Sequence, residues 1–60
     1  MDRAEAKRIL RECFEEENRI SGELEALGHR REALQTIEGG LADLYPGIAL
    51  EVSREMGEEA

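Results

Sequence analysis

The chain has 60 residues, of which 15 are acidic and 8 are basic, and its net charge at neutral pH is −7. A chain this short forms one domain at most, and it buries only about 60% of the surface that its unfolded form exposes. Its single cysteine excludes an internal disulfide, and one cysteine with one histidine excludes a four-ligand structural zinc site. We therefore expect no metal and no cofactor, and we expect a protein partner to supply the missing stability.

The charge pattern argues against a nucleic-acid partner, and the absence of a long apolar stretch argues against a membrane span. An acidic surface repels phosphate backbones unless its cations gather on one face, and the local basic spot Arg30-Arg31 is followed directly by Glu32. No stretch approaches the roughly 18 to 20 apolar residues that a membrane span requires. The segment Met1–Glu5 has no apolar core behind a basic start, so it does not resemble a signal peptide. We expect a cytoplasmic protein.

The first predicted element is a long helix over residues 3–38. Asp2 and Glu5 have the spacing of a capping box, in which two side chains satisfy free N–H groups at a helix start. Alanine, leucine, glutamate and arginine dominate the stretch, and all are good helix formers. Gly22 and Gly28 are possible breaks, but the apolar spacing continues in phase across Gly28. This continuity favours an uninterrupted helix.

The adjacent pair Gly39-Gly40 is a stronger break, because two glycines cost about 2 kcal/mol in a helix interior. We predict a hinge at 39–40 and a second helix over 41–56, with a break or kink at Pro46. Gly57 is expected to end this helix, which leaves an acidic tail over 57–60. The predicted fold is all-α, a helical hairpin with a long first helix and a shorter second helix.

An apolar residue recurs at every seventh position of this chain. Such a repeat places its members on one side of a helix and is typical of helices that wrap around one another. We therefore expect the hairpin to assemble into a coiled-coil-like bundle. The residues of this heptad seam are Ala6, Cys13, Ile20, Leu27, Leu34, Leu41 and Ile48.

Polar residues also occur where the seam should be apolar. Glu17, Arg31 and Glu38 occupy such positions. Their presence argues against a long uniform zipper and favours a hairpin or bundle with local polar layers.

The shorter second helix can cover only part of the first, so we expect the apolar residues of the first helix to meet a second chain. Ile9 and Phe14 widen the apolar stripe near the N-terminus, as a bundle requires. The predicted interface residues are Ile9, Leu10, Cys13, Phe14, Ile20, Leu24, Leu27 and Leu34.

The sequence offers little for catalysis, and we expect a non-enzymatic protein. Gly39-Gly40 lacks the lysine and hydroxyl residue of a phosphate-binding loop. Ser21 and Ser53 have no histidine close in sequence, and a small hairpin has no cleft in which to shift carboxylate pKa values. Cys13 is expected to be a small buried residue; the alternative is redox control, with two copies of Cys13 meeting across a two-fold axis.

The function that these features favour is self-association through the heptad seam, with a homodimer as the simplest assembly. The alternative is a small acidic chaperone or adaptor that binds an amphipathic helix of a different protein. In size, acidity and expected hairpin form the chain is similar to the short helical co-chaperones of secretion-system needle or flagellar subunits. The local likeness consists of the segment Ile37–Leu41 and the leucine-spaced first helix.

Overall fold

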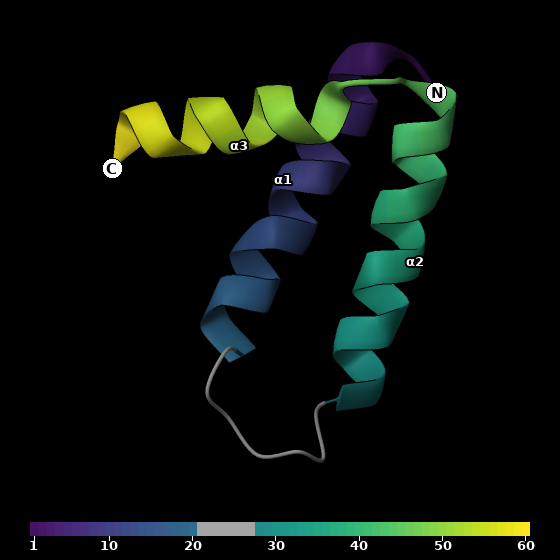
Figure 1. The fold of residues 1–60 in the computed structure, drawn as a ribbon, viewed down its shortest axis with the longest axis vertical. Helices are drawn as coiled ribbons and strands as arrows, with labels where there is room; N and C mark the ends of the chain where they lie inside the picture. The colour runs from purple at the N-terminus through teal and green to yellow at the C-terminus, as the bar shows by residue number, and fades with distance from the viewer. Residues whose placement is uncertain (21–27) are drawn as a thin grey trace.

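Figure 1 shows the fold of the computed structural model, which describes residues 1–20 and 28–60. Three α-helices follow one another in that part of the chain: α1 (Arg3–Ile20), α2 (Gly28–Leu44) and α3 (Ile48–Glu59). α2 runs back alongside α1, and α3 crosses the end of this pair that is nearest the N-terminus. The all-α class is confirmed, but the described chain is a compact three-helix globule and not a two-helix hairpin.

The predicted continuous helix over 3–38 is wrong. α1 ends at Ile20 and α2 begins at Gly28, and the two helices pack side by side, which one continuous helix cannot do. Leu24 and Leu27, on which the predicted continuity depended, lie outside the described residues. Helix propensity favours a long helix here, but a long helix leaves its apolar stripe in water. Folding back buries that stripe, and most helical stability in proteins comes from such packing.

The predicted hinge at 39–40 is also wrong, because α2 continues through Gly39-Gly40 to Leu44. Both glycines are exposed. Among the described residues the glycine with a positive φ is Gly47, so Gly39 and Gly40 do not form a turn. Leu34 and Leu41, on either side of the pair, are 8% and 5% exposed. The burial of these two leucines holds the helix across a locally unfavourable sequence.

The break predicted at Pro46 is confirmed, and it separates α2 from α3. The backbone of Gly47 has a φ of 86°, in the left-handed region that glycine tolerates best. The N–H of Ile48 donates to the carbonyl of Tyr45 at 3.1 Å, which closes the turn. Tyr45 packs against the core and donates its hydroxyl proton to the carbonyl of Met1. The turn thus ties the start of α3 to the chain terminus.

The predicted start of α1 is confirmed, and the predicted end of α3 is not. Asp2 caps α1 as expected: its Oδ1 accepts a hydrogen bond from the N–H of Glu5 at 2.8 Å. The predicted end of the last helix at Gly57 is wrong, because α3 continues to Glu59. Glu59 pairs with Arg11 of α1, and this contact holds the last turn of α3 against the first helix.

The heptad seam forms the core of the single chain. Each of its described members is buried, with an exposed fraction of 9% or less. The larger cluster, at the end where α3 crosses, contains Ala6, Leu10, Leu41, Ile48 and Val52. The smaller cluster, between α1 and α2, contains Cys13, Ile20 and Leu34, and Ile9 packs against both.

A row of ion pairs joins α1 to α3 beside the larger cluster. The Nζ atom of Lys7 lies 3.0 Å from a carboxylate oxygen of Glu51 and 2.7 Å from one of Glu55. Arg3 pairs with Glu51, and Arg11 pairs with Glu59. Basic residues spaced four apart on one helix therefore face acidic residues spaced four apart on another, so the two helices match turn by turn.

Substitutions at two glycines are expected to have opposite effects on stability. Gly39→Ala should stabilise the chain by about 1 kcal/mol, because Gly39 is helical and its added Cβ meets open space. Gly47→Ala should destabilise it by about 1 to 2 kcal/mol, because an L side chain is strained at a φ of 86°. Urea denaturation followed by circular dichroism measures both; a hinge at 39–40 predicts no gain from Gly39→Ala.

The α1–α3 ion pairs are expected to make the fold sensitive to acid. Hydrogen bonds from Arg3 and Lys7 lower the pKa of Glu51, and a hydrogen bond from Arg11 lowers the pKa of Glu59, both from 4.5. A lowered pKa contributes stability that is present above pH 4.5 and is lost as pH falls below it. The melting temperature should therefore fall below pH 4.5, and the variant Glu51→Gln should show a smaller fall. An equal fall in both proteins contradicts this assignment.

Candidate interaction surfaces

The structure buries most of the predicted interface inside the single chain. Leu10 is fully buried, and Ile20 is 9% exposed; Ile9 and Phe14 are half-buried against the core. The expectation that these residues are uncovered is therefore wrong, because α3 folds back over the N-terminal half of α1 and α2 covers Ile20. Of the remaining predicted residues, Cys13 and Leu34 are also buried, and Leu24 and Leu27 lie outside the described residues.

Four large apolar side chains of the described residues are exposed: Met1, Ile37, Leu44 and Leu50. Two of them lie on α2, where Ile37 is 46% exposed and Leu44 is 70% exposed. They lie seven residues apart, so they share one side of the helix. Ala33 and Gly40, both exposed, fall on the same side. We call these four residues, Ala33, Ile37, Gly40 and Leu44, the outer α2 face.

The four residues of the outer α2 face are uncharged and alternate large with small side chains. Arg30, seven residues before Ile37 on the same side, pairs with Glu16 of α1. A Cβ placed on Gly40 has no neighbour within 4 Å, so the space beside it is open. Its sequence signal is the spacing of 33, 37, 40 and 44, a second apolar repeat beside the heptad seam. This signal was missed because residues 39–40 were assigned to a hinge.

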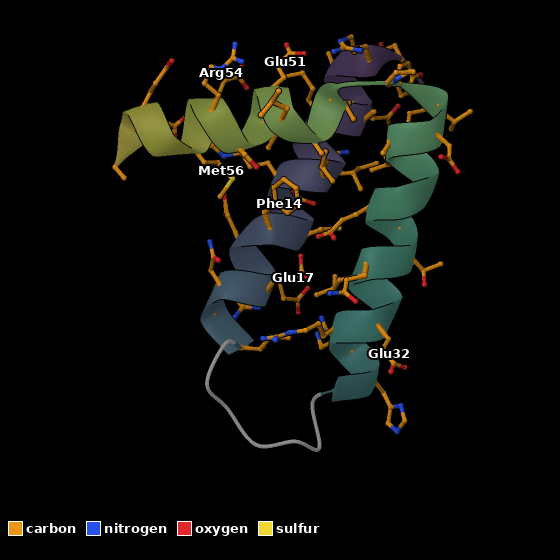
Figure 2. The ribbon with its side chains drawn as sticks, viewed as in Figure 1. Phe14, Glu17, Glu32, Glu51, Arg54 and Met56 are labelled. Carbon is orange, nitrogen blue, oxygen red and sulfur yellow. The ribbon has the colours of Figure 1, made fainter. Side chains whose placement is uncertain are left out.

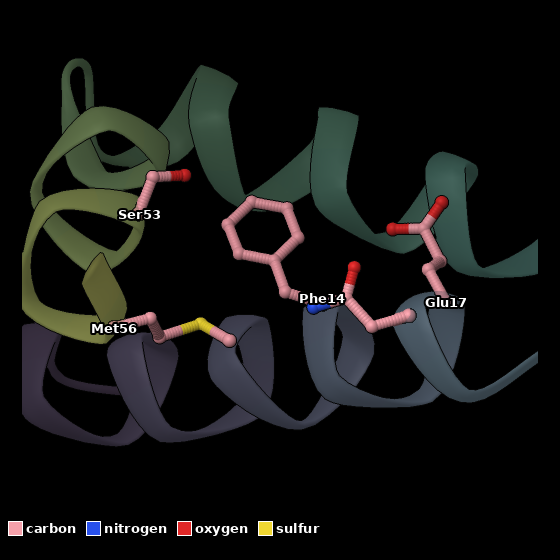
Figure 3. Close-up of a pocket in the computed structure, with 5 residues that line it drawn as sticks. Phe14, Glu17, Ser53 and Met56 are labelled. Atoms are coloured by element: carbon pink, nitrogen blue, oxygen red, sulfur yellow. The ribbon is translucent and has the colours of Figure 1, made fainter. Parts of the chain in front are cut away.

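A shallow hollow lies between α1 and α3 and has a volume of about 290 Å³. Phe14 and Met56 form its apolar wall, with Met56 extending from α3 toward Phe14 (Figures 2 and 3). Glu17, Asn18 and Ser53 add polar groups at its edge. The described residues contain no group of three or more His, Cys, Asp or Glu side chains that could hold a metal ion.

The carboxyls of Glu17 and Glu38 meet between α1 and α2. Glu17 extends from α1 into the space between the two helices (Figure 2). Burial raises the pKa of Glu38 from 4.5 to about 7, and a hydrogen bond with Glu17 adds to this shift. The Oε1 atom of Glu38 is buried and accepts no hydrogen bond from a described residue. Both residues had been identified from sequence as polar interruptions of the seam, and the structure brings them together in one layer.

Cys13 lies next to this layer and is 5% exposed. Burial raises the pKa of its thiol, and the nearby carboxylates of Glu38 and Glu17 raise it further. Cys13 is therefore a small buried residue, as expected. A disulfide between two copies requires each thiol to reach the surface, and the folded chain does not present it there.

Ion pairs also run along the surface of α1. Arg8 pairs with Glu12 at 3.2 Å and Arg11 with Glu15 at 2.9 Å, each pair four residues apart. Arg19 pairs with Glu16. Arg30 of the basic spot also pairs with Glu16, which links the far ends of α1 and α2.

Comparisons with known proteins identify no relative: no family model, no curated protein and no solved structure matches the chain. Among the described helices, none is both long and apolar enough to cross a membrane.

Proposed function

We propose that this protein is a non-enzymatic interaction module that self-associates through the outer α2 face, most simply as a homodimer. The observation that carries the proposal is the exposure of Ile37 and Leu44 on one side of α2. Two large apolar side chains in water favour association, because contact removes their surface from water.

An antiparallel pairing of two α2 helices suits the shape of this face. When Ile37 of one copy lies opposite Gly40 of the other, Leu44 lies opposite Ala33 of the other copy. Each large side chain then meets a small one, as in the packing of helical side chains into opposite gaps. Both copies contribute the same four residues and make the same contacts, as a two-fold dimer requires.

The charges around the face are consistent with a second copy as the occupant. Each copy carries a net charge of −7, so two copies repel each other least where they meet through uncharged side chains. The four residues of the outer α2 face are uncharged.

The contact is small, and we expect weak association. One face of a 17-residue helix provides less area than the roughly 1,200 to 2,000 Å² buried in stable complexes. The proposed dimer is therefore concentration-dependent, and salt should strengthen it by screening the repulsion between the acidic copies.

The chaperone-like alternative requires an apolar groove for a helix of a different protein. Its expected docking residues included Leu10, which lies beneath α3 and is fully buried. Ile37 and Leu44, exposed together on the outer α2 face, are then the residues on which we place such a client. A different protein and a second copy thus compete for the same residues, and solution mass separates the two cases.

Light scattering behind size exclusion, over a hundredfold range of concentration, tests the proposal. The native chain should move from monomer toward dimer as concentration rises, and more so at high salt. Ile37→Asn and Leu44→Asn should each weaken the dimer at least tenfold while leaving helicity unchanged. Leu50→Asn is the matched control, since Leu50 is 65% exposed but lies on α3.

A chain that stays monomeric at every concentration contradicts self-association. Equal weakening by Leu50→Asn and Leu44→Asn contradicts the assignment to the outer α2 face. In the first case, binding of an amphipathic helix that Ile37→Asn abolishes favours the chaperone-like alternative.

A further inference from the structure

The Glu17–Glu38 layer interrupts an otherwise apolar contact between α1 and α2. Glu17 lies about one turn from Cys13 and from Ile20, both buried, and Glu38 lies about one turn from Leu34 and Leu41. Like charges at such a position repel each other in a poorly hydrated setting. A proton on one of the two carboxyls removes this repulsion and lets one oxygen donate a hydrogen bond to the other.

The surrounding charges do not neutralise the pair. On α1, the neighbouring Glu16 is occupied by Arg19 and Arg30. Neither Glu17 nor Glu38 forms an ion pair with a described residue.

The other groups around the pair are an arginine, a thiol and uncharged side chains. Arg31 lies on the helix of Glu38, about two turns earlier. Cys13 contributes a buried thiol. From α3, Ser53 and Met56 line the hollow beside Glu17, and neither carries a charge.

We infer that Glu17 and Glu38 form a protonation-dependent latch, which holds α1 and α2 together while the pair keeps a proton and lets them separate more readily once that proton is lost. The latch acts within one chain, so it does not depend on self-association. Its opening exposes the smaller cluster, Cys13, Ile20 and Leu34.

The direction of the pH effect follows from the two states. In the folded chain Glu38 keeps its proton up to a pKa of about 7, whereas the unfolded value is 4.5. The stability that the proton contributes is therefore fully present below pH 4.5 and is lost as pH rises through 7. Within this window the opening equilibrium should increase by up to about tenfold per pH unit, and it should level off above.

The buried thiol of Cys13 reports the opening directly. A dipyridyl disulfide is added to the dilute 60-residue chain between pH 5 and 8, and the rate of thiol modification is measured. Each rate is divided by the rate for the same variant in urea at the same pH, which removes the pH dependence of the thiol itself.

Glu38→Gln replaces the titrating carboxyl with a neutral amide of the same shape. The normalised rate should rise with pH in the native chain and remain flat in this variant. Glu32→Gln is the matched control: it removes the same charge from the same helix, but its side chain points away from α1 (Figure 2). It should retain the native pH dependence.

Glu17→Gln provides a second, independent variant, and it should reduce the pH dependence because it removes the repelling partner. Circular dichroism at pH 5 establishes that each variant is folded before its rates are compared. A rise with pH that is as steep in folded Glu38→Gln and Glu17→Gln as in the native chain overturns the latch. So does a flat rate in the native chain.

Discussion

The docking of α3 across α1 and α2 is the contact on which the rest of the structure depends. Ile48 is fully buried and Val52 is 2% exposed, and both join Leu10 in the larger cluster. Without α3 this cluster faces water, and two short helices alone bury too little apolar surface to remain folded. The crossing becomes possible at Gly47, whose left-handed backbone redirects the chain within one turn.

Glutamates of this small protein experience two opposite environments. On the surface between α1 and α3, Glu51 and Glu59 face cations, and those cations lower their pKa values. Between α1 and α2, the half-buried Glu38 faces another carboxyl, and its pKa rises to about 7. The same type of side chain thus stabilises the α1–α3 contact as a carboxylate anion and the α1–α2 contact as a protonated carboxylic acid. Composition alone assigns every glutamate the same role, and only position distinguishes them.

The heptad seam is buried inside the single chain, so a partner cannot bind to it. A seven-residue apolar repeat is compatible with wrapping around another chain and with packing inside one chain, because both bury one side of each helix. Here the chain turns back on itself and its own helices occupy the seam. Among the described residues Ile37 and Leu44 remain exposed on one helix, and the proposed assembly therefore rests on them rather than on Leu10 and Phe14.

The sequence by itself determined the all-α class, the cap at Asp2, the break at Pro46 and the buried side of each helix, because these depend on spacing and on local backbone chemistry. Only the tertiary structure decided that α1 and α2 pack side by side, that α2 continues through Gly39-Gly40, and which helices face each other. Glycine weakens a helix by about 1 kcal/mol, which the burial of flanking leucines outweighs. The meeting of Glu17 with Glu38 likewise depends on two helices folding together, and no local pattern contains that information.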